Sequence, residues 1–257
     1  MPVDLFAPGV PQALVLLAVR LTGLLLVAPV FSAKTVPVRA RTGLLLVLTL
    51  LLAPVAVRAT HTPPVVAPES VAAELLVGFA LGFGAAVLVG AVETAGDLMA
   101  TTIGLSGATL LDPMSGGASP VLAQFSQLFA VTVLLALDGH LVMLAAFAES
   151  VRAMPVGGAV DLQAGLAALV ASGSTLFLLG LRFAAPAIAA AMIGNTALAV
   201  LTRVAPSINV LTVAFPLQAA IGLTAVTAAL SMTAAWLAGW NGHYGDAIGG
   251  VFAALLR

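Results

Sequence analysis

The residues that could carry chemistry in this sequence are few, and most of them stand inside long apolar stretches. Glu93 and Asp97 are four residues apart, so a helix would place both carboxylates on one face, where they could handle a proton or a cation. Asp138 and His140 flank Gly139 within another apolar stretch, and histidine titrates near neutral pH. We favour the structural alternatives: the two acids mark where a helix leaves apolar surroundings, and Asp138 and His140 cap two half-helices.

Three arginines present the same choice. Arg20, Arg182 and Arg203 lie within or at the end of apolar runs. An arginine at the centre of a membrane helix costs about 2.5–3.5 kcal/mol on insertion scales, so it needs a carboxylate, carbonyl groups or water. These arginines could line a gate or a transport pathway, but we favour a structural role for them. Arg20 is expected to pair with a residue such as Glu74 or with a partner subunit, and Arg203 to reach an interface from a helix end.

The amino-acid composition indicates that these apolar stretches lie in a membrane and not in water. Of 257 residues, 61% are hydrophobic and 7% are charged, and the mean hydropathy is +1.19, whereas soluble domains carry about 25% charged residues. A net charge of −1 gives no footprint for nucleic acid. The sequence has no cysteine and no ligand-spaced group among its three histidines, and it lacks the common catalytic motifs. We therefore predict an integral membrane protein that is not an enzyme and has no metal or cofactor.

The apolar runs define the elements that position these residues. They fall at about 12–33, 43–57, 71–92, 121–148, 162–204 and 207–239. No alternating pattern appears, and a bilayer leaves no water for unpaired backbone groups, so the sequence predicts an all-α fold without a β-sheet. Loops are expected at 60–68, 104–120, 154–158 and 239–250, the last one before a short terminal helix.

These runs are irregular. The run 43–57 is shorter than the roughly 20 residues of a straight crossing, and Asp138–His140 divides the fourth run into two marginal halves. Prolines are expected to kink or break helices, and they stand at Pro29, Pro186, Pro206 and Pro216. Broken helices at membrane depth are tolerated where protein covers them. We predict kinked helices and helical hairpins in a single membrane domain, 1–257, that partner chains cover.

Two glycine-rich segments favour close packing and a constriction. Gly78 and Gly82 form a small-residue helix face that lets backbones approach closely. The loop 104–120 combines glycines with large apolar side chains, which favours the lining of a hydrophobic constriction over an ordinary surface loop. Its candidate residues are Gly104, Leu105, Gly107, Leu110, Leu111, Asp112, Pro113, Met114, Gly116 and Gly117.

An ordered set of motifs across nearly the whole chain resembles the FliR/SctT family of flagellar and type III secretion export gates. It comprises Arg20 with Ala28-Pro-Val-Phe31, Glu93 to Asp97 with Gly104-Leu-Ser106, Asp138-Gly-His140, Asn195, Arg203-Val-Ala-Pro206 and Phe215-Pro-Leu217. The resemblance implies a bacterial inner-membrane subunit of the flagellar basal body or secretion apparatus. It implies assembly with FliP-like and FliQ-like subunits into a conduit for unfolded proteins, beside an FlhB-like switch subunit and an FlhA-like ring.

The resemblance also maps the family's plug loop onto residues 104–119 and implies that Asn195 takes part in packing. Aromatic residues are common in the family where Gly107 and Leu110 stand here, so a softer seal by Leu110, Leu111 and Met114 is expected. The alternative function is a small-solute secondary transporter with Arg182 and Pro186 at a midplane site. An intramembrane enzyme is a third possibility, which the missing motifs disfavour.

Overall fold

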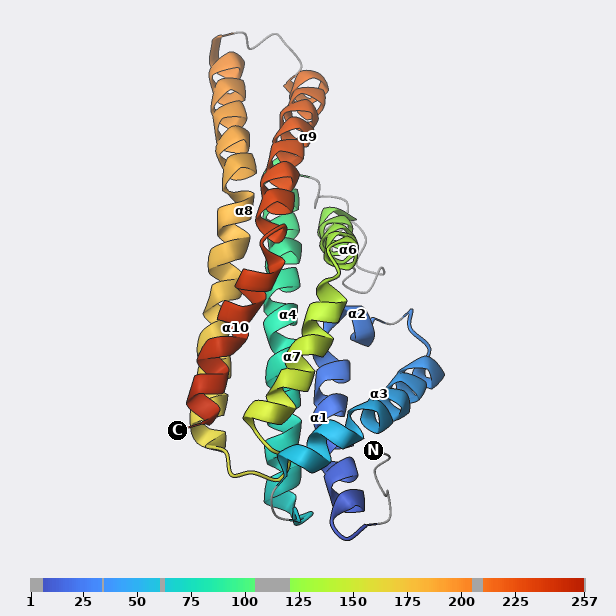
Figure 1. The fold of residues 1–257 in the computed structure, drawn as a ribbon. Helices are drawn as coiled ribbons and strands as arrows, with labels where there is room; N and C mark the ends of the chain where they lie inside the picture. Colours follow the sequence, from blue (N-terminus) through green and yellow to red (C-terminus); the bar gives the residue numbers. More distant parts are fainter. Residues whose placement is uncertain (1–6, 34, 61–62, 105–120, 205–209, 257) are drawn as a thin grey trace. The chain divides into compact units, whose positions relative to one another are not determined.

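The computed structural model describes residues 7–33, 35–60, 63–104, 121–204 and 210–256, with the backbone alone for 210–215. Within these ranges every regular element is a helix, which confirms the all-α prediction (Figure 1). The helices are α1 (Val10–Val27), α2 (Pro29–Ser32), α3 (Val38–Ala59), α4 (Pro68–Ile103), α6 (Val121–Ala136), α7 (Gly139–Ala153), α8 (Leu162–Val204), α9 (Val210–Leu237) and α10 (Trp240–Leu255).

The helices have the length and hydropathy of membrane spans. In the described part of the chain, α1, α3, α4, α8 and the segment Pro216–Leu237 of α9 are each long and apolar enough to cross a bilayer. Helices α6 and α7 pass the same test only as a pair, and they are bent by 68° at the break between them. The prediction of an integral membrane protein with an interrupted fourth run is confirmed. The second apolar run, 43–57, was predicted to be too short for a straight crossing, and this prediction is wrong. The helix that contains it, α3, has 22 residues because it includes arginines at both of its ends.

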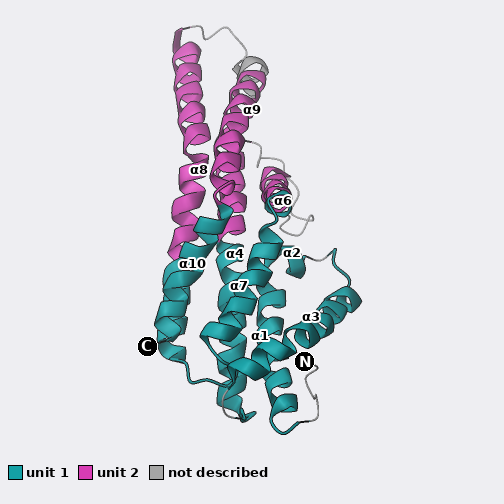
Figure 2. Ribbon diagram, viewed as in Figure 1, with its two compact units in different colours: residues 1–87, 134–173, 240–257 teal, residues 88–133, 174–239 magenta. Residues whose placement is uncertain are grey.

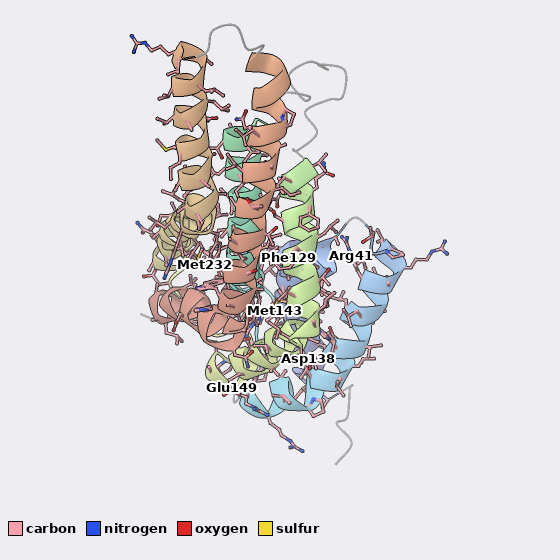
Figure 3. The ribbon with its side chains drawn as sticks, turned by 90° about the horizontal axis from the view of Figure 1, so that it is seen from above. Arg41, Phe129, Asp138, Met143, Glu149 and Met232 are labelled. Atoms are coloured by element: carbon pink, nitrogen blue, oxygen red, sulfur yellow. The ribbon has the colours of Figure 1, made fainter. Side chains whose placement is uncertain are left out.

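The break between α6 and α7 lies at Asp138, labelled in Figure 3. Asp138 occupies the N-cap position of α7, but its side chain makes no capping hydrogen bond and is exposed. The predicted side-chain cap is therefore wrong. N-cap residues normally have extended backbone, whereas Asp138 is left-handed, with φ of 55°. Gly139 follows because a Cβ there would stand 2.9 Å from Leu134 Cγ and 3.0 Å from Trp240 Nε1.

The prolines act differently from one another. Pro29 starts α2 directly after the break that ends α1, as predicted. Pro186 and Pro216 lie inside continuous helices, so the predicted interruption of the fifth run is wrong. A proline removes one backbone hydrogen bond, and a long apolar helix in a medium without water keeps the others. Pro206 lies outside the described residues.

The predicted glycine-rich loop at 239–250 is also wrong, since α10 begins at Trp240 and runs through it. Its glycines are poor helix formers, but the helix is held by four buried side chains, Trp240, Tyr244, Val251 and Leu255. The Tyr244 hydroxyl donates a 2.9 Å hydrogen bond to the carbonyl oxygen of Leu81 on α4. Burial raises the pKa of this phenol above its ordinary value.

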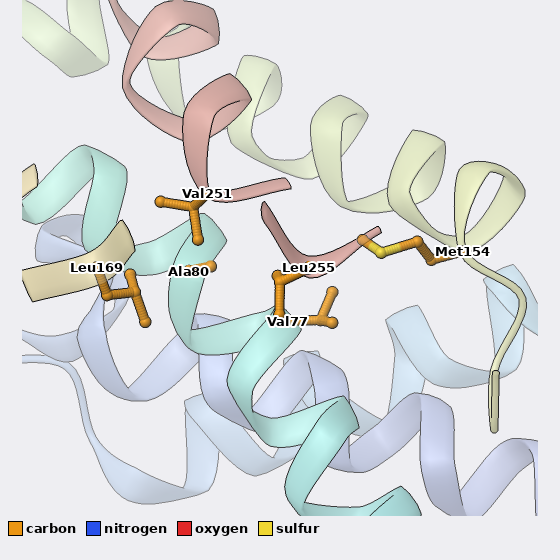
Figure 4. Packing of buried hydrophobic residues seen from close by; sticks show 6 residues of the cluster. All are labelled: Val77, Ala80, Met154, Leu169, Val251 and Leu255. Carbon is orange, nitrogen blue, oxygen red and sulfur yellow. The ribbon is translucent and has the colours of Figure 1, made fainter. Parts of the chain in front are cut away.

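The chain divides into two compact units (Figure 2). Unit 1 comprises residues 1–87, 134–173 and 240–257, and unit 2 comprises 88–133 and 174–239. The core of unit 1 joins the first part of α4 to α8, α10 and the turn after α7 (Figure 4). Its buried members are Val77, Ala80, Met154, Leu169, Val251 and Leu255.

Unit 2 contains the second part of α4, most of α6 and α8, and α9. Its helices approach closely at glycines. A Cβ on Gly180 of α8 would stand 3.0 Å from Thr94 of α4, and one on Gly222 of α9 would overlap Ile103. Phe183 and Trp236 meet edge to face with their ring centroids 5.1 Å apart, which joins α8 to α9.

Candidate functional site

A buried polar network in unit 1 is centred on Arg20. This arginine lies near the middle of α1 and is 1% exposed. Its Nε donates to Glu74 Oε2 at 2.5 Å and its Nη2 to Glu74 Oε1 at 3.1 Å. The Nη1 atom donates to the carbonyl oxygen of Ser150 at 3.0 Å. The guanidinium therefore meets the requirement for a partner that its apolar surroundings impose.

Glu74 is equally buried, at 2% exposure, and receives a further donor. The backbone N–H of Gly157 donates to Glu74 Oε1 at 2.8 Å, from the turn that follows α7. Gly157 has a φ of 79°, a conformation that favours glycine. One carboxylate and one guanidinium thus connect α1, α4, α7 and the following turn.

The ion pair is possible because the backbones of α1 and α4 approach closely at glycines. A Cβ on Gly78 would overlap the carbonyl oxygen of Arg20 itself. A Cβ on Gly82 would stand 2.8 Å from the carbonyl oxygen of Leu24, and one on Gly23 would stand 2.7 Å from the backbone nitrogen of Phe79. The small-residue face predicted around Gly78 and Gly82 lies at this contact.

The acidic pair Glu93 and Asp97 lies on the second part of α4, in unit 2, and both residues are partly buried. Glu93 Oε2 accepts a 2.9 Å hydrogen bond from Gln127 Nε2 of α6. Helix α4 continues for six residues beyond Asp97 to Ile103. No cation lies in an ion pair with either acid among the described residues.

The remaining predicted charges are not buried within the chain. Arg182 and Arg203 are exposed on α8, and neither has an ion pair in the described residues, so Arg182 is not buried within the single chain. The reason is that it stands outside the contact faces of α8, next to exposed apolar side chains. Arg203 lies in the last turn of α8, and its expected contact with an interface stays a prediction. Asn195 is also exposed within the part of the chain that the structure describes. His140 is partly buried, and its Nδ1 has no hydrogen-bond partner among the described residues.

The predicted plug residues 105–117 lie outside the described residues, but the two helices that carry the loop are described. Gly104, the first loop residue, is exposed and has a φ of 82°. Ile103 before it is buried against Gly222 of α9. On the other side, Ala123 of α6 is fully buried, and a Cβ on Gly96 of α4 would stand 2.8 Å from its Cα. Both ends of the loop are thereby attached to packed helices of unit 2.

Large apolar side chains remain exposed on several helices. On α8 and α3 they include Leu166, Val170, Phe177, Leu178, Leu181, Met192, Ile193, Val200, Leu46, Val47, Leu50 and Leu51. Within the apolar 18-residue stretch of each helix, the buried share is 17% for α3, 28% for α8 and 67% for α4. Helix α4 is therefore surrounded within the chain, while α3 and α8 offer apolar surface to other molecules.

The arrangement connects and packs helices. In the described ranges no three histidine or acidic residues gather as a metal site. The sequence offered Glu74 as one possible partner of Arg20, beside a partner subunit, and assigned no role in holding the helices to Ser150, Gly157 or Tyr244. The adjacent glycines at 157 and 158 were the available signal for a positive φ after α7.

The chain is similar to a family of bacterial export proteins and to flagellar proteins of several bacteria. The family model of bacterial export proteins, family 1, matches residues 12–241. The flagellar biosynthetic protein FliR of Escherichia coli (strain K12) is 33% identical over 84% of this chain and 83% of its own length. FliR of Pectobacterium carotovorum is 32% identical over 80% and 79%, and FliR of Bacillus subtilis (strain 168) is 26% identical over 90% and 88%.

Proposed function

The chain belongs to family 1 of the bacterial export proteins, and from this premise we propose that it is the FliR-type subunit of a protein export gate in the bacterial inner membrane. The family is not enzymatic, in agreement with the sequence prediction. In this proposal the whole chain, 1–257, acts as one domain. It joins FliP-like and FliQ-like subunits around a conduit for unfolded proteins, beside an FlhB-like switch subunit and an FlhA-like ring.

The observation that carries this proposal is the exposed apolar surface of α8 together with the charge in its middle. Arg182 is exposed four residues after Leu178, which is 70% exposed, and one residue after Leu181, which is 54% exposed. Acyl chains around this face would leave the guanidinium without an acceptor, at a cost of about 2.5–3.5 kcal/mol. A neighbouring subunit that supplies a carboxylate or carbonyl group removes that cost, so the face suits protein better than lipid.

We assign the seal of the conduit to the loop 104–119. The support is its combination of glycines with Leu110, Leu111 and Met114, and the attachment of both its ends to packed helices. A loop that must close a narrow passage needs fixed ends and an adaptable middle, and apolar side chains exclude ions by excluding water. Glu93 and Asp97 lie on α4, the helix that leads into this loop.

A small-solute transporter is the weaker candidate. Its predicted midplane site needed a break at Pro186 and a buried Arg182, but α8 is continuous there and Arg182 is exposed. The buried charges of Arg20 and Glu74 are fully engaged with each other and with backbone groups. This pair therefore leaves no free charge for a solute.

Deletion of Gly116 and Gly117 tests the sealing role. A shorter loop should seal the conduit less well, so we expect higher ion conductance through the assembled gate in planar bilayers, with normal assembly. The matched control replaces both glycines by serine, which keeps the loop length and should leave conductance near that of the unaltered gate. Unchanged conductance after the deletion, in a gate that assembles normally, would contradict the assignment.

A further inference from the structure

A second feature of the molecule is a basic groove between α3 and α7, both in unit 1. The groove has a volume of about 340 Å³ and is lined by Pro54, Val55, Arg58, Ala59 and Arg152. Arg58 lies in the last turn of α3 and Arg152 in the last turn of α7. Two cations from different helices thus line one opening.

Most of the donors in this groove are unused. Arg152 Nη1 donates to Glu149 Oε2 at 3.0 Å, in an exposed pair. Arg58 makes no hydrogen bond or ion pair in the described residues, and neither guanidinium donates to the carbonyl groups at the helix ends. Each guanidinium has five N–H donors in a fork that suits the oxygens of a phosphate. The two arginines that line the groove, together with Glu149, which pairs with Arg152, carry a net charge of +1.

The position of Arg58 along α3 matches a membrane boundary. Arg39 and Arg58 are nineteen residues apart in one helix, which at about 1.5 Å per residue is a distance of about 28 Å. The hydrocarbon core of a bilayer is about 30 Å thick. If α3 crosses the bilayer, its two exposed arginines stand at the two headgroup levels, and the groove beside Arg58 lies at one of them.

The surface of α3 on the membrane side of the groove fits an acyl chain. Val47 and Leu51 are exposed, at 62% and 67%, and they share a helix face with Val55 and Arg58, four to eleven residues farther along. The distance from Val47 to Arg58 is about 16 Å along the helix, close to half of the hydrocarbon core, which is the depth of one leaflet. An apolar strip of one leaflet's length therefore ends at a basic groove.

From these observations we propose that the groove between α3 and α7 is a binding site for an anionic phospholipid. Its phosphate is held by Arg58 and Arg152, and its acyl chain lies along Val47 and Leu51. Basic pockets at helix ends are the kind of site that holds anionic headgroups in membrane proteins. The inference rests on α3 lying in the bilayer and does not require the export function.

The test measures retention of lipid by the full chain in mild detergent, by native mass spectrometry. Dioleoyl phosphatidylglycerol is compared with dioleoyl phosphatidylcholine, which has the same acyl chains and a zwitterionic headgroup. At about 1 kcal/mol per arginine, the double variant Arg58→Gln with Arg152→Gln should lower retention of the anionic lipid roughly thirtyfold. Retention of the zwitterionic lipid by the double variant should stay within about twofold of its retention by the unaltered chain. This lipid has no net negative charge, so it gains little from electrostatic attraction to the arginines.

Two control variants separate charge from structure. Glu149→Gln removes the competing carboxylate and should keep or increase retention of the anionic lipid. Replacement of both arginines by lysine keeps the charge and should preserve most of the headgroup preference. Equal retention of the two lipids by the unaltered chain would overturn the proposal. So would loss of the anionic lipid at millimolar inorganic phosphate, since that result would identify a site for free anions. The chain could prefer the anionic lipid and yet fail to assemble with partner subunits. That result would support the lipid site and would count only against the export proposal.

Discussion

At the scale of single residues, the Arg20–Glu74 pair distinguishes this chain most clearly from a simple apolar bundle. Both side chains are almost completely buried, and their hydrogen bonds together connect α1, α4, α7 and the turn after α7. Loss of one member would leave the other charge buried without a partner. Such a change costs about 3–5 kcal/mol in buried pairs, far more than the pair itself contributes.

We therefore expect Glu74→Gln and Arg20→Leu to lower the thermal stability of the purified chain strongly, each by about 3–5 kcal/mol of unfolding free energy. Glu149→Gln removes one member of an exposed pair and should cost less than about 1 kcal/mol. Thermal unfolding in detergent measures all three variants. A Glu74→Gln variant as stable as Glu149→Gln would show that the buried pair holds nothing together.

The sequence predicted part of this residue-scale picture. An arginine inside an apolar run needs a partner, so Arg20 was expected to pair with a residue such as Glu74 or with a partner subunit. Arg182 obeys the same rule but has no ion-pair partner among the residues that the structure describes. Its exposure could not be predicted, because the contact faces of α8 depend on tertiary packing. The missing cap at Asp138 likewise depends on a left-handed backbone conformation that the residue type permits but does not require.

At the scale of helices, glycines decide which elements approach closely. Gly78, Gly82 and Gly23 lie where α1 and α4 meet. In contrast, an added Cβ on four glycines of α10 would meet no atom of another described segment within 4 Å; these are Gly242, Gly245, Gly249 and Gly250. The same residue type therefore has opposite consequences on two helices. The spacing of Gly78 and Gly82 predicted a close-packing face, whereas Gly23 was not predicted. The sequence predicted a loop at the glycines of α10, because glycine has a low helix propensity. That propensity does not reveal the four buried side chains that hold α10.

Alanine substitutions separate these two kinds of glycine. Gly78→Ala would force α1 away from α4 and disturb the geometry of the Arg20–Glu74 pair, so we expect a destabilisation of about 2 kcal/mol or more, in the range of other overpacked sites. Gly249→Ala should instead stabilise the chain by about 0.5–1 kcal/mol, because alanine is the better helix former and finds open space. Chemical or thermal unfolding compares them directly. Equal effects at both positions would contradict the packing role of Gly78.

At the scale of the whole molecule, the account depends on the distribution of apolar surface. All-α architecture and membrane spans followed from hydropathy and the absence of alternation, and the two interruptions near Pro29 and Asp138 followed from local sequence signals. The course of the chain through Pro186 did not, because a proline can either end a helix or be tolerated inside it. The exposed faces of α3 and α8 were not predicted residue by residue, since exposure depends on which helices pack together.

The central claim is that other export-gate subunits, rather than lipid alone, surround these exposed helices. Co-expression of the chain with its FliP-like and FliQ-like partners, followed by purification in mild detergent through a tag on this chain, tests it most directly. The account predicts a stable complex of defined mass that retains both partners. A stable monomer or dimer that is free of both partners and moves a small solute across vesicles would contradict it.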